Sequence, residues 1–283
     1  MRVVARTALL VVGLAACGNS SSMMGDDMQG TPDAAIAGGW TELLGKNWTL
    51  QPQSENESDL QIETLDRDVY ISAIRPIAPP GTHHTLLFRG LTGTNAIYAS
   101  GVGTGELEFP TGKGLKLTAG TTLGLQLHIY NTGDEVLTGH SGIEIKEVDA
   151  ASITEEIDLF LPGPKTLNIP TGVSTTTGTC TVNQTQTMFA LFPHMHQWGV
   201  HFKTTLNVNG VDQVLHDADY TFEHQYVETF APIVLNAGDK IKTECTYNNT
   251  TGAELHWGES SDTEMCFSLL YRYPKQNNEF CQQ

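Results

Sequence analysis

The chain has 283 residues and is acidic, with 32 aspartate and glutamate residues, 15 lysine and arginine residues and a formal net charge of −17 at pH 7. Such a surface repels phosphate backbones and anionic headgroups, so the composition argues against nucleic-acid binding and against a basic lipid-binding face. The length allows one large or two ordinary domains after the N-terminal segment.

The first 17 residues predict export. Arg2 and Arg6 precede a short apolar run that ends in Leu-Ala-Ala-Cys at residues 14–17, a pattern typical of a signal peptide. This box also resembles the bacterial lipoprotein signal, in which the cysteine carries the lipid. We therefore expect lipidation at Cys17 and a protein of the bacterial cell envelope, on its periplasmic or outer-membrane face, that meets the membrane only through this anchor. An ordinary signal peptide with an incidental cysteine is the alternative.

Residues 18–39 are rich in Ser, Gly, Met and Asp and show no apolar periodicity. This composition predicts a disordered tether between the anchor and the folded part of the chain.

Strand patterns dominate from Trp40 onward. In residues 123–130, leucine and isoleucine alternate with Gln126, His128 and Tyr130, so apolar and polar side chains fall on opposite faces of a strand. Similar alternation predicts strands at residues 68–74, 188–196, 201–208, 241–247 and 265–273. Many short strands separated by Gly, Asn and Pro turns, without a long amphipathic helix, predict an all-β fold of antiparallel β-sandwiches or jelly rolls.

The best candidate for a domain boundary is the acidic, less regular stretch at residues 149–156. It divides the folded part into an N-terminal sandwich at residues 40–152 and a C-terminal sandwich at residues 153–283.

The cysteines predict two disulfides in the second of these sandwiches. With Cys17 assigned to lipid, an even set of four remains, which in an exported protein indicates disulfide bonding. These residues are Cys180, Cys245, Cys266 and Cys281. The sequence alone allows three pairings.

Three histidines in the first half are candidate metal ligands. His83 and His84 are adjacent, so in a regular strand they would face opposite ways and could meet one ion only at a bulge or a strand start. The preceding Pro-Pro-Gly makes an irregular start plausible. His128, on its alternating strand, is the third candidate.

The second half holds a stronger pattern. Residues i and i+2 of a strand share a face, so His194 and His196 can reach one metal ion. Met265 supplies a thioether, and two imidazoles with a soft thioether favour copper, because thioether sulfur suits Cu(I) far better than zinc or magnesium. Two alternatives stay open: Met265 as an ordinary core residue, and a zinc site. A zinc site would need a third ligand from among His201, His216, His224 and His256.

Four motifs in this order and spacing give the chain a family resemblance. They are HHTLLF at residues 83–88, LQLHIY at 125–130, HMH at 194–196 and SSDTEMC at 260–266. From about residue 40 to residue 281 the chain resembles the copper type II, ascorbate-dependent monooxygenases, which include peptidylglycine α-hydroxylating monooxygenase and dopamine β-monooxygenase.

The resemblance implies a fold, two copper sites and a disulfide pairing. The fold would be two tandem jelly-roll-like antiparallel β-sandwich domains, with one copper each, facing across an open solvent-filled cleft. The implied residues are His83, His84 and His128 for the electron-transfer copper, His194, His196 and Met265 for the catalytic, oxygen-activating copper, Gln126 on the ligand face, and the disulfides Cys180–Cys281 and Cys245–Cys266.

The chain also departs from the peptide-hydroxylating members. They carry an arginine two residues before the HxH pair, where this chain has Phe192, and an asparagine and a tyrosine after the methionine ligand, where it has Phe267 and Leu269. Loss of a charged anchor and of two polar contacts argues against peptides with a C-terminal glycine as substrates.

The sequence therefore predicts an exported two-copper monooxygenase. It would hydroxylate a C–H bond of a small molecule other than a peptidylglycine, using O2 and electrons from ascorbate or another one-electron donor. The alternative is a non-catalytic copper store, carrier or sensor on the cell envelope. A third possibility, an adhesion or carbohydrate-binding sandwich, predicts no copper.

Overall fold

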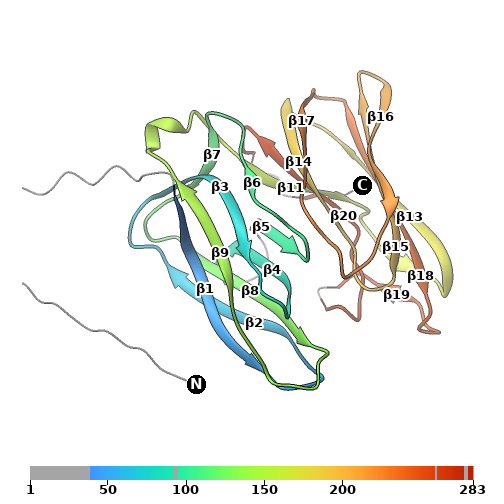
Figure 1. Ribbon diagram of the computed structural model, residues 1–283. Helices are drawn as coiled ribbons and strands as arrows, with labels where there is room; N and C mark the ends of the chain where they lie inside the picture. The colour runs from blue at the N-terminus through green and yellow to red at the C-terminus, as the bar shows by residue number, and fades with distance from the viewer. Residues whose placement is uncertain (1–38, 92–94, 259, 277–279, 283) are drawn as a thin grey trace, which may run out of the picture. The chain divides into compact units, whose positions relative to one another are not determined.

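β-Strands make up almost all regular structure in the computed structural model, which describes residues 39–91, 95–258, 260–276 and 280–282 (Figure 1). The one helical element in these residues is a single 3-10 turn at Ala150–Ser152. The prediction of an all-β, antiparallel, sandwich-like fold is confirmed. No helix in the described residues is long and apolar enough to span a membrane. The predicted signal peptide, its lipidation site Cys17 and residues 18–38 of the predicted tether lie outside the described residues.

The first half of the described chain forms two sheets (Figure 1). The larger sheet runs in the order β1 (Trp40–Leu50), β9 (Leu137–Glu147), β3 (Val69–Ile77), β7 (Lys113–Leu117) and β10 (Glu155–Glu156), with β6 (Leu107–Glu108) also paired to β3. The smaller sheet runs in the order β2 (Ser54–Thr64), β8 (Thr122–Asn131), β4 (Thr82–Arg89) and β5 (Ala96–Gly101). The smaller sheet carries the first group of predicted ligands.

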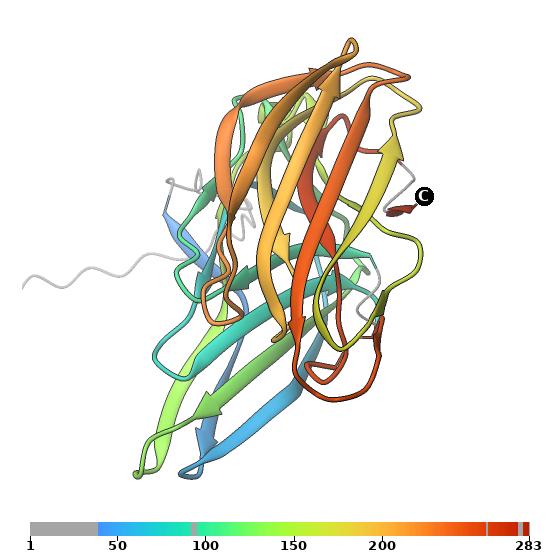
Figure 2. The same cartoon turned by 90° about the vertical axis from the view of Figure 1, so that its right-hand side faces the viewer.

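The second half forms two further sheets and a short ribbon. One sheet runs β17 (Glu228–Leu235), β14 (Gln186–His194), β20 (Phe267–Tyr273), β11 (Asp158–Gly163) and β21 (Phe280–Gln282). The other, which faces the viewer in Figure 2, runs β13 (Gly172–Thr181), β18 (Lys240–Asn249), β15 (Gly199–Val208) and β16 (Val211–Asp219). The ribbon pairs β12 (Asn168–Ile169) with β19 (Leu255–His256).

The alternation predicted for residues 123–130 is confirmed in β8. Its leucines and Ile129 are at most 1% exposed and pack in the core between the sheets. Gln126 and His128 lie on the opposite face, as the two-residue period of a strand requires. β8 pairs with β4 so that His84 lies directly opposite His128. Strand register therefore brings two of the predicted ligands together across 44 residues of sequence.

β4 contains the irregularity that the adjacent histidines require. The register between β4 and β8 shifts between Thr82 and His84, so His83 lies at a break in the ladder. A bulge of this kind lets neighbouring side chains turn to the same side of a sheet. The expectation of an irregular segment at His83 is confirmed.

Near the second group of predicted ligands, the strands predicted at residues 188–196 and 265–273 are longer than the strands in the structure. β14 ends at His194, so His196 lies beyond the strand, just before a turn, and β20 begins at Phe267, so Met265 precedes that strand. The physical reason is a side-chain acceptor. The Glu264 carboxylate accepts hydrogen bonds from the backbone N–H groups of His196 and Trp198, which are therefore not available to a neighbouring strand.

The larger core cluster contains residues from both halves of the chain. Phe109 and Phe189 pack edge to face with ring centroids 6.2 Å apart, and Leu161 and Phe192 belong to the same cluster. The described residues, from 39 onwards, all fall in one compact unit. The predicted division between residues 152 and 153 stays a prediction, because β10, which follows it, pairs with β7, which precedes it.

Candidate functional site

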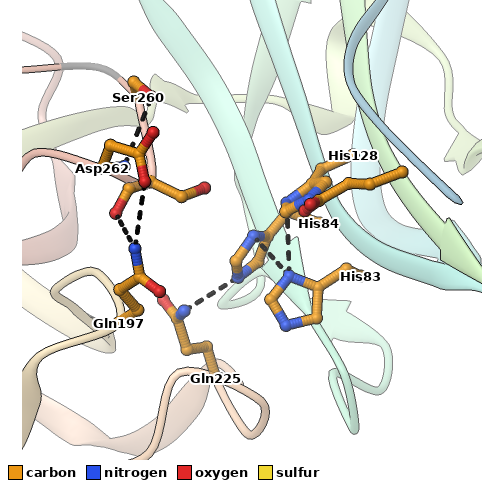
Figure 3. Close-up of polar contacts among 9 residues, drawn as sticks. His83, His84, His128, Gln197, Gln225, Ser260 and Asp262 are labelled. Atoms are coloured by element: carbon orange, nitrogen blue, oxygen red, sulfur yellow. Dashed lines mark hydrogen bonds and ion pairs between the residues drawn. The ribbon is translucent and has the colours of Figure 1, made fainter. Parts of the chain in front are cut away.

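His83, His84 and His128 form a compact trio of imidazoles. The Nδ1 atom of His83 lies 3.1 Å from Nδ1 of His84 and 3.3 Å from Nδ1 of His128 (Figure 3). One ligand atom from each residue lies within 4.8 Å of the others. Among the described residues this is the one group of three or more His, Cys, Asp or Glu side chains so arranged. The trio has the donor geometry of a metal site.

Burial keeps two rings of the trio, His83 and His84, in the form that binds metal. The pKa of His83 is lowered to about 4 by burial and by the charge of His128. Burial, followed by the charge of His83, also holds the pKa of His84 well below its usual range. Both rings are therefore neutral at pH 7, as metal binding requires.

His128 is oriented by a carboxylate. Its Nε2 atom lies 2.5 Å from Oε1 of Glu55, and a hydrogen bond from Nε2–H to this carboxylate directs Nδ1 towards the other two rings. Carboxylates commonly orient metal-binding histidines in this way.

His194 and His196 form a second pair, with ring centroids 5.2 Å apart. Nδ1 of His196 donates to the carbonyl oxygen of Thr263 over 2.9 Å, and Nδ1 of His194 lies 2.9 Å from Oε1 of Gln225. Both contacts leave Nε2 as the metal-binding nitrogen. Burial and the charge of His196 lower the pKa of His194 to about 3, and burial also lowers the pKa of His196.

Met265 is held beside this pair by its neighbours. Glu264, which is fully buried, accepts hydrogen bonds of 2.9 Å from the N–H groups of His196 and Trp198 and so ties the two segments together. The hydroxyl of Tyr247 donates to the Met265 carbonyl over 2.7 Å. Burial raises the pKa of Glu264 to about 7, against the lowering effect of these backbone hydrogen bonds.

Both disulfides implied by the resemblance are present. Cys180 is bonded to Cys281, and Cys245 is bonded to Cys266. The second bond fastens the residue after Met265 to β18.

The two histidine groups meet at one cavity of about 480 Å³. The predicted site residues that line it are His84, His128, His194, His196, Met265, Gln126, Phe192, Phe267 and Leu269. Leu161, Trp257 and Phe280 add apolar walls. Among the described residues that line the cavity there is no Asp, Glu, Lys or Arg. This lack of charged side chains among the described lining residues agrees with the more apolar site that the sequence predicts.

A segment between β16 and β17 separates the two groups, and the sequence patterns did not indicate it. The ring of Phe222 packs on His83 and His84 with centroids 4.6 and 5.1 Å apart, and its centroid lies 6.3 Å from that of His196. Gln225 contacts both His84 and His194. The resemblance implies an open cleft at this place, whereas the structure has direct side-chain contact.

The sequence patterns missed several residues of the site, and these were not equally predictable from the sequence. Glu264 stands in the SSDTEMC motif beside a predicted ligand, so its acidic side chain was a usable signal. Glu55, Phe222 and Gln225 lie in stretches without a motif, and their contacts with the ligands span up to 141 residues of sequence.

The histidines considered for a zinc site have other partners. His201 pairs with Asp217, and His216 pairs with Glu228. His224 and His256 contact Thr221 and Asn168. None of these contacts involves the His194–His196 pair.

Comparisons with known proteins point to a copper-dependent family. Residues 159–283 match the C-terminal domain of the copper type II ascorbate-dependent monooxygenases. The human protein named DBH-like monooxygenase protein 1 is 31% identical over 222 residues, which cover 68% of this chain and 35% of the human protein. The chicken and mouse proteins of that name are each 35% identical over 100 residues, or 33% of this chain and 16% of each relative.

These matches support a relationship between this chain and the copper type II ascorbate-dependent monooxygenase family.

The chain spans only about a third of the length of the human relative, so the match covers part of that protein. The family depends on copper and ascorbate by its description. The residue types present here fit copper, since three imidazole nitrogens converge in one group, and two further histidines line a cavity together with a methionine.

Proposed function

We propose that this chain is an exported two-copper monooxygenase. It would hydroxylate a C–H bond of a small molecule other than a peptidylglycine, with O2 as co-substrate and ascorbate or another one-electron donor as reductant. The observation that carries the proposal is that both histidine groups and Met265 border one cavity.

The proposal gives each group of residues a role. His83, His84 and His128 would hold the electron-transfer copper, and His194, His196 and Met265 the catalytic copper. When bound, the two coppers supply oxygen activation and the second electron that the reaction consumes. The neutral imidazoles and the thioether favour the Cu(I) state. The apolar cavity walls would exclude water and orient the C–H bond.

The cavity lining supports a neutral, largely apolar substrate. Phe192, Phe267 and Leu269 stand where peptide-hydroxylating members have polar anchors, and all three line the cavity. An apolar wall gives a charged carboxylate no partner, which makes its burial unfavourable. Peptidylglycines fit this lining poorly.

The proposed location is the cell envelope, with a lipid on Cys17 as the membrane contact. Two disulfides in the folded part support an oxidising compartment. The partners would be the substrate and an electron donor. The negative net charge argues against nucleic acid.

Copper counting and substrate-coupled oxygen uptake test the proposal. The purified chain should bind two coppers and, with ascorbate, consume O2 in step with hydroxylated product. Replacing His83 and His84 together with alanine should leave one copper and abolish hydroxylation. Two bound coppers without any substrate-coupled uptake would establish the alternative, a non-catalytic copper store, carrier or sensor. A chain without copper would contradict both functions.

A further inference from the structure

Gln225 joins the two histidine groups through one side chain. Its Nε2 atom lies 2.8 Å from Nε2 of His84, and its Oε1 atom lies 2.9 Å from Nδ1 of His194 (Figure 3 shows the contact with His84). The residue is only 2% exposed. One buried amide therefore contacts a ring from each proposed copper site, on the ring nitrogen that does not face the metal.

An amide offers different groups on its two sides. Its oxygen only accepts hydrogen bonds, and its nitrogen only donates them. In the observed orientation His194 donates from Nδ1, so its Nε2 carries a lone pair and is ready to bind metal. His84 accepts at Nε2, so the proton of its neutral ring lies on Nδ1, the atom that faces the trio.

Turning the amide over reverses the two roles but does not remove the conflict. His84 would then donate from Nε2 and present a free Nδ1, while His194 would accept at Nδ1 and carry its proton on Nε2. Either orientation prepares one histidine for metal and blocks the other. The conclusion therefore does not depend on how the oxygen and nitrogen of the amide are assigned.

Two further contacts fix Gln225 in place and favour the observed orientation. Its Nε2 also donates to the carbonyl oxygen of Phe222 over 3.0 Å, which an amide oxygen could not do. Its own carbonyl oxygen accepts a hydrogen bond of 3.2 Å from Thr104 and lies so close to Gly101 that a Cβ there would stand 2.6 Å from it. These contacts hold the backbone of Gln225 against the end of β5.

We propose that Gln225 couples the two copper sites, so that loading one opposes loading the other. With metal on both His84 and His194, each ring presents an N–H to the same amide, whose oxygen faces one ring and whose NH2 group faces the other. One of the two hydrogen bonds must then break, which frees Gln225 from one half of the site. Because the observed orientation leaves His194 ready, the His194–His196–Met265 site fills first.

This inference rests on the proposed two-copper function, and a Cu(I) titration tests it separately. The metal-free chain is titrated without oxygen against a competing Cu(I) chelator. The native chain should show two dissociation constants about tenfold apart, the size typical of coupling between sites. X-ray absorption should show sulfur from Met265 on the first copper.

Three variants identify the role of the amide. Gln225→Glu supplies two acceptor oxygens, so both sites should bind copper more tightly and with nearly equal constants. Gln225→Leu removes both contacts, so the tenfold gap should close without the gain in affinity. Gln213→Leu, at an exposed glutamine in β16, should keep the native gap. Thermal unfolding without metal shows whether each variant is folded. If Gln225→Leu does not fold, the result for Gln225→Glu decides whether the two sites are coupled.

Equal constants in the native chain, or an unchanged gap in Gln225→Glu, would overturn the coupling while leaving a two-copper function intact. A gap that persists in a folded Gln225→Leu would do the same. Fewer than two coppers in every variant would contradict the proposed function together with this inference.

Discussion

Glu264 is a buried carboxyl group. Burial makes its charged form unfavourable, and its hydrogen bonds hold two segments of the chain together. It accepts from the N–H groups of His196 and Trp198 and is fully buried. Burial raises its pKa from 4.5 to about 7. Since the pKa of the folded chain lies above that of the unfolded chain, folding favours the protonated form. The resulting stabilisation is complete below about pH 4.5 and is lost as the pH rises through about 7.

Glu264→Gln should remove this pH dependence. Between pH 5 and pH 8 the metal-free native chain should lose about 2–3 kcal/mol of unfolding free energy relative to the variant. Urea unfolding of both proteins at the two pH values gives the difference, and the contributions of the histidines cancel because both proteins carry them. Parallel pH profiles would show that the carboxyl group does not change its protonation in this range.

At the scale of the strand, sequence patterns predicted regular segments well. The alternation in β8 and the Pro-Pro-Gly before His83 were both visible in the sequence, and register across β4 and β8 then placed His84 opposite His128. The patterns failed where a side chain replaces a strand as hydrogen-bond acceptor. β14 stops at His194 because Glu264 takes the next backbone donors, and no periodicity can show this.

The segment that separates the histidine groups was also beyond sequence patterns. Phe222 and Gln225 lie between β16 and β17, in a stretch without apolar alternation. Their importance comes from contacts with β4, which lies 141 residues away at the Gln225–His84 hydrogen bond. The candidate ligands therefore stand in local motifs, whereas the residues that connect them do not.

The disulfide between β18 and the start of β20 should matter for the second copper site in particular. Replacing Cys245 and Cys266 with alanine opens a loop with a sequence separation of 21 and should cost about 3 kcal/mol of stability. It should also weaken Cu(I) binding beside Met265, because the residue next to this ligand loses its attachment. Thermal unfolding and a Cu(I) titration measure the two effects.

The other disulfide is the matched control. It closes a longer loop, with a sequence separation of 101, so the Cys180→Ala, Cys281→Ala variant should lose more stability, about 4–5 kcal/mol. Neither of its cysteines adjoins a proposed ligand, and both coppers should stay bound with native affinity. If the two double variants lost copper affinity equally, the effect would be general destabilisation.

At the scale of the whole molecule, the charged surface contrasts with the cavity. The chain carries a net charge of −17, yet no Asp, Glu, Lys or Arg is among the described residues that line the cavity. A negative surface attracts cations towards the protein, but the described lining of the cavity offers a bound cation no carboxylate, and desolvation of the cation is unfavourable. The cavity should therefore bind neutral molecules more tightly than either cations or anions.

Three probes of equal size and different charge test this selection: 3-phenylpropan-1-ol, 3-phenylpropanoate and 3-phenylpropylamine. The metal-free chain should bind the neutral alcohol at least about tenfold more tightly than either ion, because neither charge finds an oppositely charged side chain among the described lining residues. Fluorescence of Trp257, which is 51% exposed and lines the cavity, reports binding. Ala96→Phe should block the cavity, whereas Val214→Phe, on the exposed face of β16, should not. Tighter binding of the amine or the carboxylate would mean that the cavity holds a charged anchor, and the substrate would then be an ion.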